Sequence, residues 1–266
     1  MNLMIYLNAL MPILIVAMFF WGVSLTRKDV SIVDSLWSVF FIVATFVVFL
    51  QVKNPTLRAQ IVTLLVLIWG VRLSLYITIR HWGHEEDHRY QAIRANNEPG
   101  FNYKSLYLIF FFQAGLAWII AMPLLFSVTS ESSLTYIDLT GFVFWLVGMF
   151  FESVADYQLW KFKKNPANSG KILTDGLWKY TRHPNYFGEF MIWWGYFCFA
   201  WSAGAYFTIF SPLIITFLLL KFSGVGLLEQ TMKRRPGYEK YMKSTNTFFP
   251  GFSRGEKNTG EGHEYN

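Results

Sequence analysis

The stretch VDSLWSVFFIVATFVVFLQV, from Val33 to Val52, is almost entirely apolar and carries one ionisable side chain, that of Asp34. A helix of ~20 apolar residues crosses the ~30 Å hydrocarbon core of a bilayer, so this run predicts a membrane-spanning helix. Six further runs approach or reach that length, namely Leu3–Leu25, Ala59–Ile79, Leu106–Val128, Leu139–Trp160, Tyr186–Trp201 and Tyr206–Leu228. We therefore expect an all-α polytopic membrane protein with seven transmembrane helices.

The composition agrees with membrane embedding. Of the 266 residues, 53% are hydrophobic, 20% are aromatic and only 15% are charged, whereas soluble proteins carry ~25% charged residues. The mean hydropathy is +0.31. A soluble globule is thereby excluded, and so is disorder for the bulk of the chain. The single cysteine, Cys198, excludes an internal disulfide and a Cys-rich zinc site.

The basic residues predict the orientation, because Lys and Arg accumulate in cytoplasmic loops. With seven helices and the N-terminus outside, 19 of the 23 basic residues fall in cytoplasmic segments and only Lys53 and Arg58 fall in outer loops. The C-terminus is then cytoplasmic. The net charge of +6 is explained mostly by this asymmetry, and without a DNA-reading motif we expect no nucleic-acid partner.

The chain shows no internal repeat, which argues against an inverted-repeat transporter. We expect one domain over residues 1–250, followed by a Gly-rich polar tail, 251–266, that is disordered. The sequence does not indicate the oligomeric state.

Ionisable residues inside the apolar runs point to a site, because each costs at least ~2.5–3.5 kcal/mol at membrane depth. They are Asp34, Arg72, Glu152, Asp156, Glu189, Lys221 and Glu229. Glu152 and Asp156 share one helix face, and Lys163 continues it. A polar ligand site near the cytoplasmic helix ends is one interpretation. The alternative is that these acids pair with basic residues of neighbouring helices and only hold the bundle together.

The segment YTRHPNYFGE, from Tyr180 to Glu189, is the most informative. Pro184 suits the first turn of a helix, whose free N–H groups favour an anion beside Arg182 and His183. Asn185 and Glu189 follow on one face, one turn apart. Together they predict a site for a polar ligand that enters from the cytosol.

Two further sets of polar and aromatic residues stand near helix ends. His81, His84 and His88 allow a metal site, a solvated ion-paired loop or a lid over the ligand. The second set comprises Asp34 with Trp37, and Trp69 with Arg72 and Tyr76. If Asp34 and Arg72 avoid lipid, these residues face the interior of the helix bundle. A functional role is one interpretation, and an ion pair between Asp34 and Arg72 is the alternative.

Several of these elements carry a family resemblance. They are Arg182-His183-Pro184-Asn185-Tyr186, Gly188-Glu189, Glu229, Pro236-Gly237-Tyr238-Glu239-Lys240-Tyr241, Asp34-x-x-Trp37, Trp69-Gly70-x-Arg72-Leu73 and Glu86-Asp87-x-Arg89-Tyr90. The chain resembles the membrane steroid 5α-reductase superfamily, in particular its bacterial branch. Isoprenylcysteine carboxyl methyltransferases share the Arg-His-Pro-x-Tyr element and the later Glu, so the motif indicates the superfamily better than the reaction.

The resemblance implies a seven-helix bundle with NADPH in a cavity open to the cytosol and a Δ4-3-oxo steroid that enters from the lipid. It assigns cofactor binding to Glu152, Asp156, Lys163, Arg182, His183, Asn185, Tyr186, Lys221 and Glu229. Glu189 matches an acid near the nicotinamide. Asp34 falls where animal reductases have a glutamate that helps to hold the 3-keto group. The tyrosine that shares this task has two candidate positions here, Trp69 by gapless alignment and Tyr76 as the nearest phenol.

The resemblance thus predicts an NADPH-dependent membrane oxidoreductase in the bacterial inner membrane, with Asp34, Tyr76 and Glu189 as catalytic residues and Trp37 and Trp69 as substrate-binding residues. Its substrate is a steroid or a similar lipophilic enone, its surroundings are membrane lipid, and no metal takes part. Because Rossmann and P-loop motifs are absent, a nucleotide has to sit among helices. The alternatives are an S-adenosylmethionine-dependent methyltransferase acting on a lipid or prenyl-cysteine, and a cofactor-free transporter or assembly protein.

Overall fold

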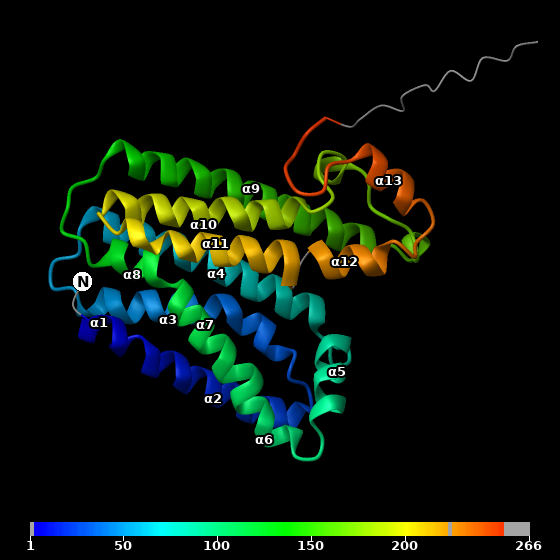
Figure 1. Ribbon diagram of the computed structural model, residues 1–266, viewed down its shortest axis with the longest axis horizontal. Coiled ribbons are helices and arrows are strands. Elements are labelled where there is room, and N and C mark those ends of the chain that lie inside the picture. The colour runs from blue at the N-terminus through cyan, green and yellow to red at the C-terminus, as the bar shows by residue number, and fades with distance from the viewer. Residues whose placement is uncertain (1–2, 223–224, 253–266) are drawn as a thin grey trace, which may run out of the picture. The chain divides into compact units, whose positions relative to one another are not determined.

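The computed structural model describes residues 3–222 and 225–252, and this part of the chain is helical throughout, with no strand (Figure 1). The expected tail 251–266 lies outside the described residues beyond Phe252. The α-helices are α1 (Leu3–Asn8), α2 (Leu10–Arg27), α3 (Ile32–Gln51), α4 (Leu57–His81), α5 (His88–Asn97), α6 (Phe101–Ser105), α7 (Phe112–Ile120), α8 (Met122–Val128), α9 (Tyr136–Lys164), α10 (Pro184–Ser202), α11 (Phe210–Phe217), α12 (Val225–Met232) and α13 (Tyr238–Ser244). Two π-helical segments also occur, η1 (Leu106–Phe111) and η5 (Leu218–Phe222). There are three short 3₁₀ helices in the described residues, η2 (Pro166–Asn168), η3 (Gly176–Lys179) and η4 (Tyr206–Ile209).

Five helical segments are long and apolar enough to cross a membrane, so the chain is an integral membrane protein. They are Met4–Arg27, Ile32–Gln51, Leu57–His81, Phe101–Ile120 and Tyr136–Lys164. A shorter apolar segment follows at Tyr206–Lys221. The expected all-helical fold is confirmed, while the count of seven spans and the orientation of the termini stay predictions.

The chain divides into two compact units. The first unit comprises Met1–Phe144 and Trp193–Ile214, and the second comprises Trp145–Ile192 and Ile215–Asn266. Helices α9, α10 and α11 each contribute residues to both units. The expectation of a single domain over residues 1–250 stays a prediction.

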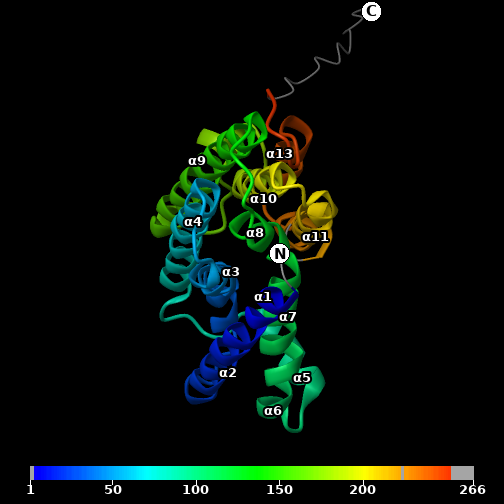
Figure 2. The ribbon, with the colours of Figure 1, turned by 90° about the vertical axis from the view of Figure 1, so that its left-hand side faces the viewer.

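In the first unit, α3 lies between α2 and α4, while α7 packs on α2 and α3, and α8 packs on α3 and α4 (Figures 1 and 2). The approach of α3 to α4 depends on Gly70, because a Cβ there would lie 2.8 Å from the Ile42 side chain and 3.2 Å from the carbonyl oxygen of Ser38. The Ser38 hydroxyl donates a 2.8 Å hydrogen bond to the Gly70 carbonyl at the same contact. Small side chains and a shared polar bond are how helices associate closely in membranes.

The core of the first unit is aromatic. Trp69 and Trp193 are fully buried, with their rings 5.8 Å apart, and Phe41 lies 4.7 Å from Trp193. Tyr196 closes the cluster at 6.1 Å from Trp69. Edge-to-face contacts of this kind add to the burial of large apolar surfaces.

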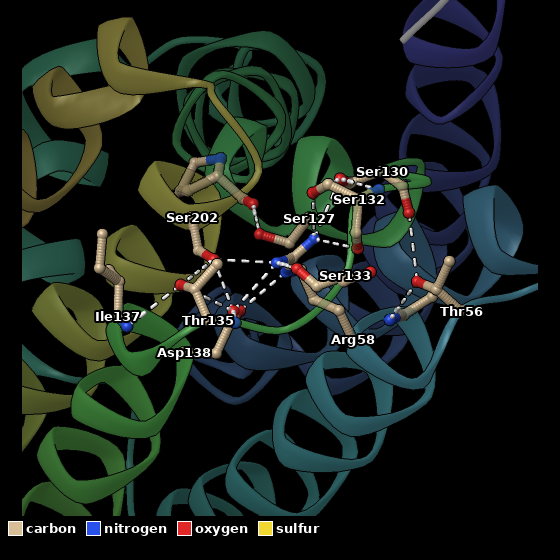
Figure 3. Close-up of polar contacts among 12 residues, drawn as sticks. Thr56, Arg58, Ser127, Ser130, Ser132, Ser133, Thr135, Ile137, Asp138 and Ser202 are labelled. Carbon is tan, nitrogen blue, oxygen red and sulfur yellow. Dashed lines mark hydrogen bonds and ion pairs between the residues drawn. The ribbon is translucent and has the colours of Figure 1, made fainter.

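A buried ion pair fixes one end of the first unit. Arg58, at the start of α4, has a completely buried side chain, and its Nε donates a 2.7 Å hydrogen bond to Asp138 of α9 (Figure 3). The other guanidinium nitrogens donate to oxygens of the 130–133 connection and to Ser202 of α10. The sequence placed Arg58 in an outer loop as a topology marker, whereas the structure shows it joining three segments of the chain.

We expect Asp138→Asn to lower the free energy of unfolding by about 3–5 kcal/mol, because it leaves a buried guanidinium without its counter-charge. Thermal unfolding of the detergent-solubilised protein measures this loss. Lys53→Met, which removes an exposed charge nearby, is the control and should unfold like wild type. An Asp138→Asn variant as stable as the control would show that the pair does not hold the fold.

In the second unit, two glycines bring α9 and α10 together. A Cβ on Gly188 of α10 would lie 2.5 Å from the backbone nitrogen of Glu152, and a Cβ on Gly148 of α9 would lie 2.6 Å from the carbonyl oxygen of Gly188. Neither clash can be relieved by a side-chain rotation, because backbone atoms are involved. This close approach places the polar residues of the two helices against each other.

Candidate functional site

The polar cluster of the second unit forms where α9 meets α10. The Asn185 side-chain amide, one residue into α10, donates a 3.2 Å hydrogen bond to Oδ1 of Asp156 on α9. Pro184 begins α10, as the sequence predicts, and this start fixes the position of Asn185. The structure therefore brings together two predicted site residues that are 29 positions apart in the sequence.

Two more predicted acids belong to the same pair of helices. Glu152, one turn before Asp156 on α9, is only 2% exposed, and Asp156 is 3% exposed. Glu189, one turn after Asn185 on α10, is half-buried. Buried carboxylates are costly in a protein of this kind, so their accumulation marks the α9–α10 contact as a candidate ligand site.

Arg182 precedes α10 and holds the C-terminal segment in place. Its Nε donates to Glu229 of α12 at 2.8 Å, and its Nη1 donates to the carbonyl oxygens of Met242 and Thr245. Its Nη2 donates to the Thr247 hydroxyl at 2.7 Å and lies 2.7 Å from Glu229. Because protein groups engage all three nitrogens, Arg182 acts chiefly by positioning the segments around it, and a direct contact with a cofactor stays a prediction.

Glu229 is the counter-charge of this arrangement. Burial raises the pKa of its carboxyl, but hydrogen bonds from His183 and Arg182 and their charge outweigh burial and hold the pKa below its usual range. The His183 ring lies 3.4 Å from the carboxylate and stacks on Tyr186 with the rings 5.6 Å apart. The four residues form one connected group at the start of α10.

The predicted lysines lie on the surface of the second unit. Lys163 near the end of α9 and Lys221 in η5 both have exposed side chains.

A hollow of 150 Å³ adjoins Arg182 and the 242–247 segment. It is smaller than the ~300 Å³ at which small-molecule pockets begin, so this hollow by itself does not accommodate a nucleotide.

We expect Arg182→Lys to lower the free energy of unfolding by roughly 2–4 kcal/mol, because a lysine ammonium cannot reproduce the planar set of donors. Thermal unfolding measures this change, and Arg234→Lys, at an exposed position, is the control. Since the folded-state pKa of Glu229 is lowered, the ion pair contributes fully above its ordinary pKa and loses its contribution as the pH falls through the lowered value. The difference between wild type and variant should therefore shrink in acid; a pH-independent difference would contradict the ion-pair role.

The polar cluster of the first unit is built around Asp34, in the first turn of α3. The Tyr90 hydroxyl of α5 donates a 2.5 Å hydrogen bond to Oδ1 of Asp34, and Nη2 of Arg89 donates a 2.7 Å bond to Oδ2. The Gln113 side chain of α7 donates to the Tyr90 oxygen at 3.1 Å. Asp87 caps α5 through the Arg89 backbone N–H and also accepts from the Arg89 side chain.

The sequence interpretation missed Tyr90 as a site residue. Burial raises the pKa of the Tyr90 phenol, and the negative charge of Asp34 raises it further, so the phenol keeps its proton at neutral pH. Tyr90 is 6% exposed although it belongs to a helix that connects two spans. The Glu86-Asp87-x-Arg89-Tyr90 element contained the signal, but nothing in its spacing points to Asp34.

The other predicted residues of the first unit lie elsewhere. Tyr76 lies on α4 between two cations, with the guanidinium carbons of Arg72 and Arg80 at 5.6 and 5.5 Å from its ring. Asp34 pairs with Arg89, and the alternative pairing of Asp34 with Arg72 stays a prediction. Trp37 is half-buried against Phe41, at 5.2 Å.

Trp69 lies in the aromatic core. Its indole nitrogen and that of Trp193 are buried without a hydrogen-bond partner in the described part of the chain. Trp37 and Trp69 as substrate contacts, and Tyr76 as a catalytic residue, stay predictions.

The histidine-rich connection after α4 is ion-paired. His81 lies 3.0 Å from Asp29, His88 lies 3.4 Å from Asp87, and Glu86 binds Arg94 at 2.8 Å. Within residues 3–222 and 225–252, no group of three or more His, Cys, Asp or Glu side chains could hold a metal ion.

Fold and site define the class of protein as an integral membrane protein, helical throughout its described part, with a buried carboxylate–amide cluster and a carboxylate–phenol pair. A family model described as "Protein of unknown function (DUF1295)" matches residues 20–245, and the chain belongs to this family. The resemblance to the steroid 5α-reductase superfamily is confirmed by relatives named "3-oxo-5-alpha-steroid 4-dehydrogenase 1".

Three relatives illustrate the range of the similarity. The chain is 38% identical over 88 residues to "3-oxo-5-alpha-steroid 4-dehydrogenase 1" of Mus musculus, covering 32% of this chain and 34% of that one. The human protein of the same name is 36% identical over 107 residues, which is 40% of this chain and 39% of that one. An uncharacterized protein of Schizosaccharomyces pombe is 26% identical over 265 residues, covering 86% of this chain and 75% of that one.

The matches to the steroid dehydrogenases are partial, since they span about a third of the mouse protein and two fifths of the human one. A shorter match, 48% identical over 54 residues, links the chain to "Probable O-methyltransferase ustE" of Ustilaginoidea virens and covers 20% of this chain and 19% of that one. No solved structure matches the chain. The comparisons therefore show the family and a partial similarity to proteins named as steroid 4-dehydrogenases.

Proposed function

We propose that the protein catalyses the NADPH-dependent reduction of the C4=C5 double bond of a Δ4-3-oxo steroid or a similar lipophilic enone. The observation that carries the proposal is the pairing of Asp34 with the protonated phenol of Tyr90, because an enone reductase needs a donor for the carbonyl oxygen. Relatives named as steroid 4-dehydrogenases agree with this chemistry.

The α9–α10 cluster supplies the groups that a nucleotide cofactor requires. Asn185 and Asp156 offer amide and carboxylate atoms to ribose and nicotinamide, and Glu152 and Glu189 extend the same surface. The exposed Lys163 and Lys221 provide positive charge for phosphates. His183 and Tyr186 form a flat stacked pair at the start of α10. This donor set fits NADPH, and we assign these residues to holding it.

The reaction divides between cofactor and protein. When bound, NADPH supplies the hydride that adds to the β carbon of the enone. The electron pair of the C=C bond moves toward the carbonyl, and negative charge develops on its oxygen. To stabilise this charge, the Tyr90 hydroxyl turns its single proton from Asp34 to the carbonyl oxygen, while Gln113 donates to the phenol oxygen and holds it in place. A proton from water then adds to the α carbon, so the former double bond gains one hydride and one proton.

The proposal includes the location. We assign the protein to the bacterial inner membrane with the cofactor cluster on the cytoplasmic side, because the basic residues of the chain concentrate in the segments that the orientation places there. The lipophilic substrate then enters from the bilayer and the water-soluble cofactor from the cytosol.

We expect Tyr90→Phe to lower kcat about 10²–10³-fold, because the variant loses the donor that stabilises the developing oxyanion. Consumption of NADPH with a Δ4-3-oxo steroid measures kcat, and Tyr103→Phe, whose side chain is 75% exposed, is the control. The affinity for NADPH should not change. If Tyr76→Phe lowers kcat and Tyr90→Phe does not, the donor is Tyr76 and the assignment to Tyr90 fails.

We expect NADPH to raise the unfolding temperature of the purified protein, since a ligand that binds only the folded state stabilises it. Asn185→Ala should require roughly ten times more NADPH for the same shift, because it removes a polar group from the cofactor surface. Asn54→Ala, in an exposed connection, should respond like wild type. No stabilisation of wild type by NADPH would count against the reductase.

An S-adenosylmethionine-dependent methyltransferase acting on a lipid or prenyl-cysteine carboxylate is the second candidate, because the match to an O-methyltransferase is the most identical of the short ones reported above. Stabilisation by S-adenosylhomocysteine and not by NADPH would favour it. The exposed lysines near the end of α9 argue for the reductase, since NADPH carries three phosphates and S-adenosylmethionine carries none.

A further inference from the structure

A cavity of 780 Å³ lies entirely within the first unit, among α2, α3 and α4. Its floor is the α3 face that carries Ile32, Leu36 and Val39, and its walls include Phe20 of α2 and Ser74 of α4. Its volume falls within the ~300–1,000 Å³ range of small-molecule sites. Neither Asp34 nor Tyr90 is among its lining residues.

The cavity is apolar along the membrane-spanning helices and polar at one end. The polar rim consists of the last residue of α2, the connection to α3, and the connection after α4. Arg27 and Lys28 belong to it, and Trp82 lies there with the Arg27 guanidinium carbon 5.1 Å from its ring. Tryptophan and basic side chains at the end of membrane spans are typical of the level of lipid headgroups.

The acids of the rim are largely neutralised by other groups. Asp29 accepts from the Ser31 backbone and lies 3.0 Å from His81, and Glu86 binds Arg94. Arg27 and Lys28, by contrast, form no ion pair with any residue in the described part of the chain. The rim therefore presents two uncompensated positive charges, with Glu85 as the remaining acid.

Lys28 is also held in an unusual conformation. It ends α2 with φ +55°, and its backbone N–H donates to the Ser24 carbonyl. This left-handed position favours glycine or asparagine, so the lysine side chain occupies it at a conformational cost. The turn directs the chain from α2 into the rim of the cavity, where Lys28 stands next to Arg27.

We propose that this cavity binds an anionic phospholipid of the surrounding bilayer. An acyl chain lies between α2 and α4 on the apolar face of α3, and the headgroup phosphate binds Arg27 and Lys28. Apolar walls that belong to membrane-spanning helices suit a lipid chain, and adjacent basic residues attract an anionic headgroup. The site is additional to the proposed catalytic function and does not depend on it.

Native mass spectrometry of the detergent-solubilised full chain, titrated with phosphatidylglycerol, tests the proposal. We expect wild type to retain this lipid and the double variant Arg27→Gln/Lys28→Gln to bind it roughly 10- to 30-fold more weakly. Val39→Phe, which fills the cavity without changing charge, should also weaken binding. The control pair Arg80→Gln/Lys104→Gln removes two basic residues that do not line the cavity and should bind like wild type.

Four results would overturn the proposal. The first is equal affinity of wild type and the Arg27→Gln/Lys28→Gln variant. The second is equal binding of phosphatidylcholine, which would remove the role of the anionic headgroup. The third is equal thermal stabilisation by inorganic phosphate alone, which would identify a small-anion site. The fourth is displacement of the lipid by a Δ4-3-oxo steroid, which would make the cavity the substrate site. None of these measurements requires NADPH, so failure here is distinguishable from failure of the reductase proposal.

Discussion

A buried charge has to meet a partner, and this constraint organises both units of the protein. Arg58 meets Asp138 in the first unit with its side chain fully buried. Arg182 meets Glu229 in the second unit and binds two backbone carbonyls of the chain that follows. Each pair joins segments that are far apart in the sequence, so the cost of burying charge is offset by hydrogen bonds that also define the packing.

In both candidate clusters a carboxylate accepts hydrogen bonds from polar side chains, but the donors differ. In the Asp34 cluster, a carboxylate receives a phenol and a guanidinium, and the phenol remains protonated and buried. In the α9–α10 cluster, Asp156 receives the amide of Asn185 beside the buried Glu152. The Asp34 cluster thus offers a phenol proton, which the proposed carbonyl substrate requires. The α9–α10 cluster offers polar acceptors, which the proposed nucleotide requires. Arg182 supports the second cluster from outside by holding the start of α10.

The sequence predicted the helices well, because long apolar runs have few alternatives in a bilayer. The family resemblance assigned Asp156 and Asn185 to one cofactor site; the structure joins them by a hydrogen bond, and their role stays a prediction. The sequence could not predict the partner of Asp34, because Tyr90 lies 56 residues away on a short polar helix whose position no periodicity reveals. Arg58 was treated as a loop residue for the same reason: its burial depends on Asp138, which lies 80 positions further along the chain. Long-range pairing of single polar residues leaves no local signal.

Tyr90 lies on α5, a connecting helix, and not on one of the membrane-spanning helices. The helices fix Asp34, whereas α5 delivers the phenol from a segment that begins and ends outside the spans. Exchanges in this segment can therefore move the Tyr90 phenol relative to Asp34 while the apolar helices keep their packing. The spans and the placement of one phenol are thus assigned to different stretches of the same chain.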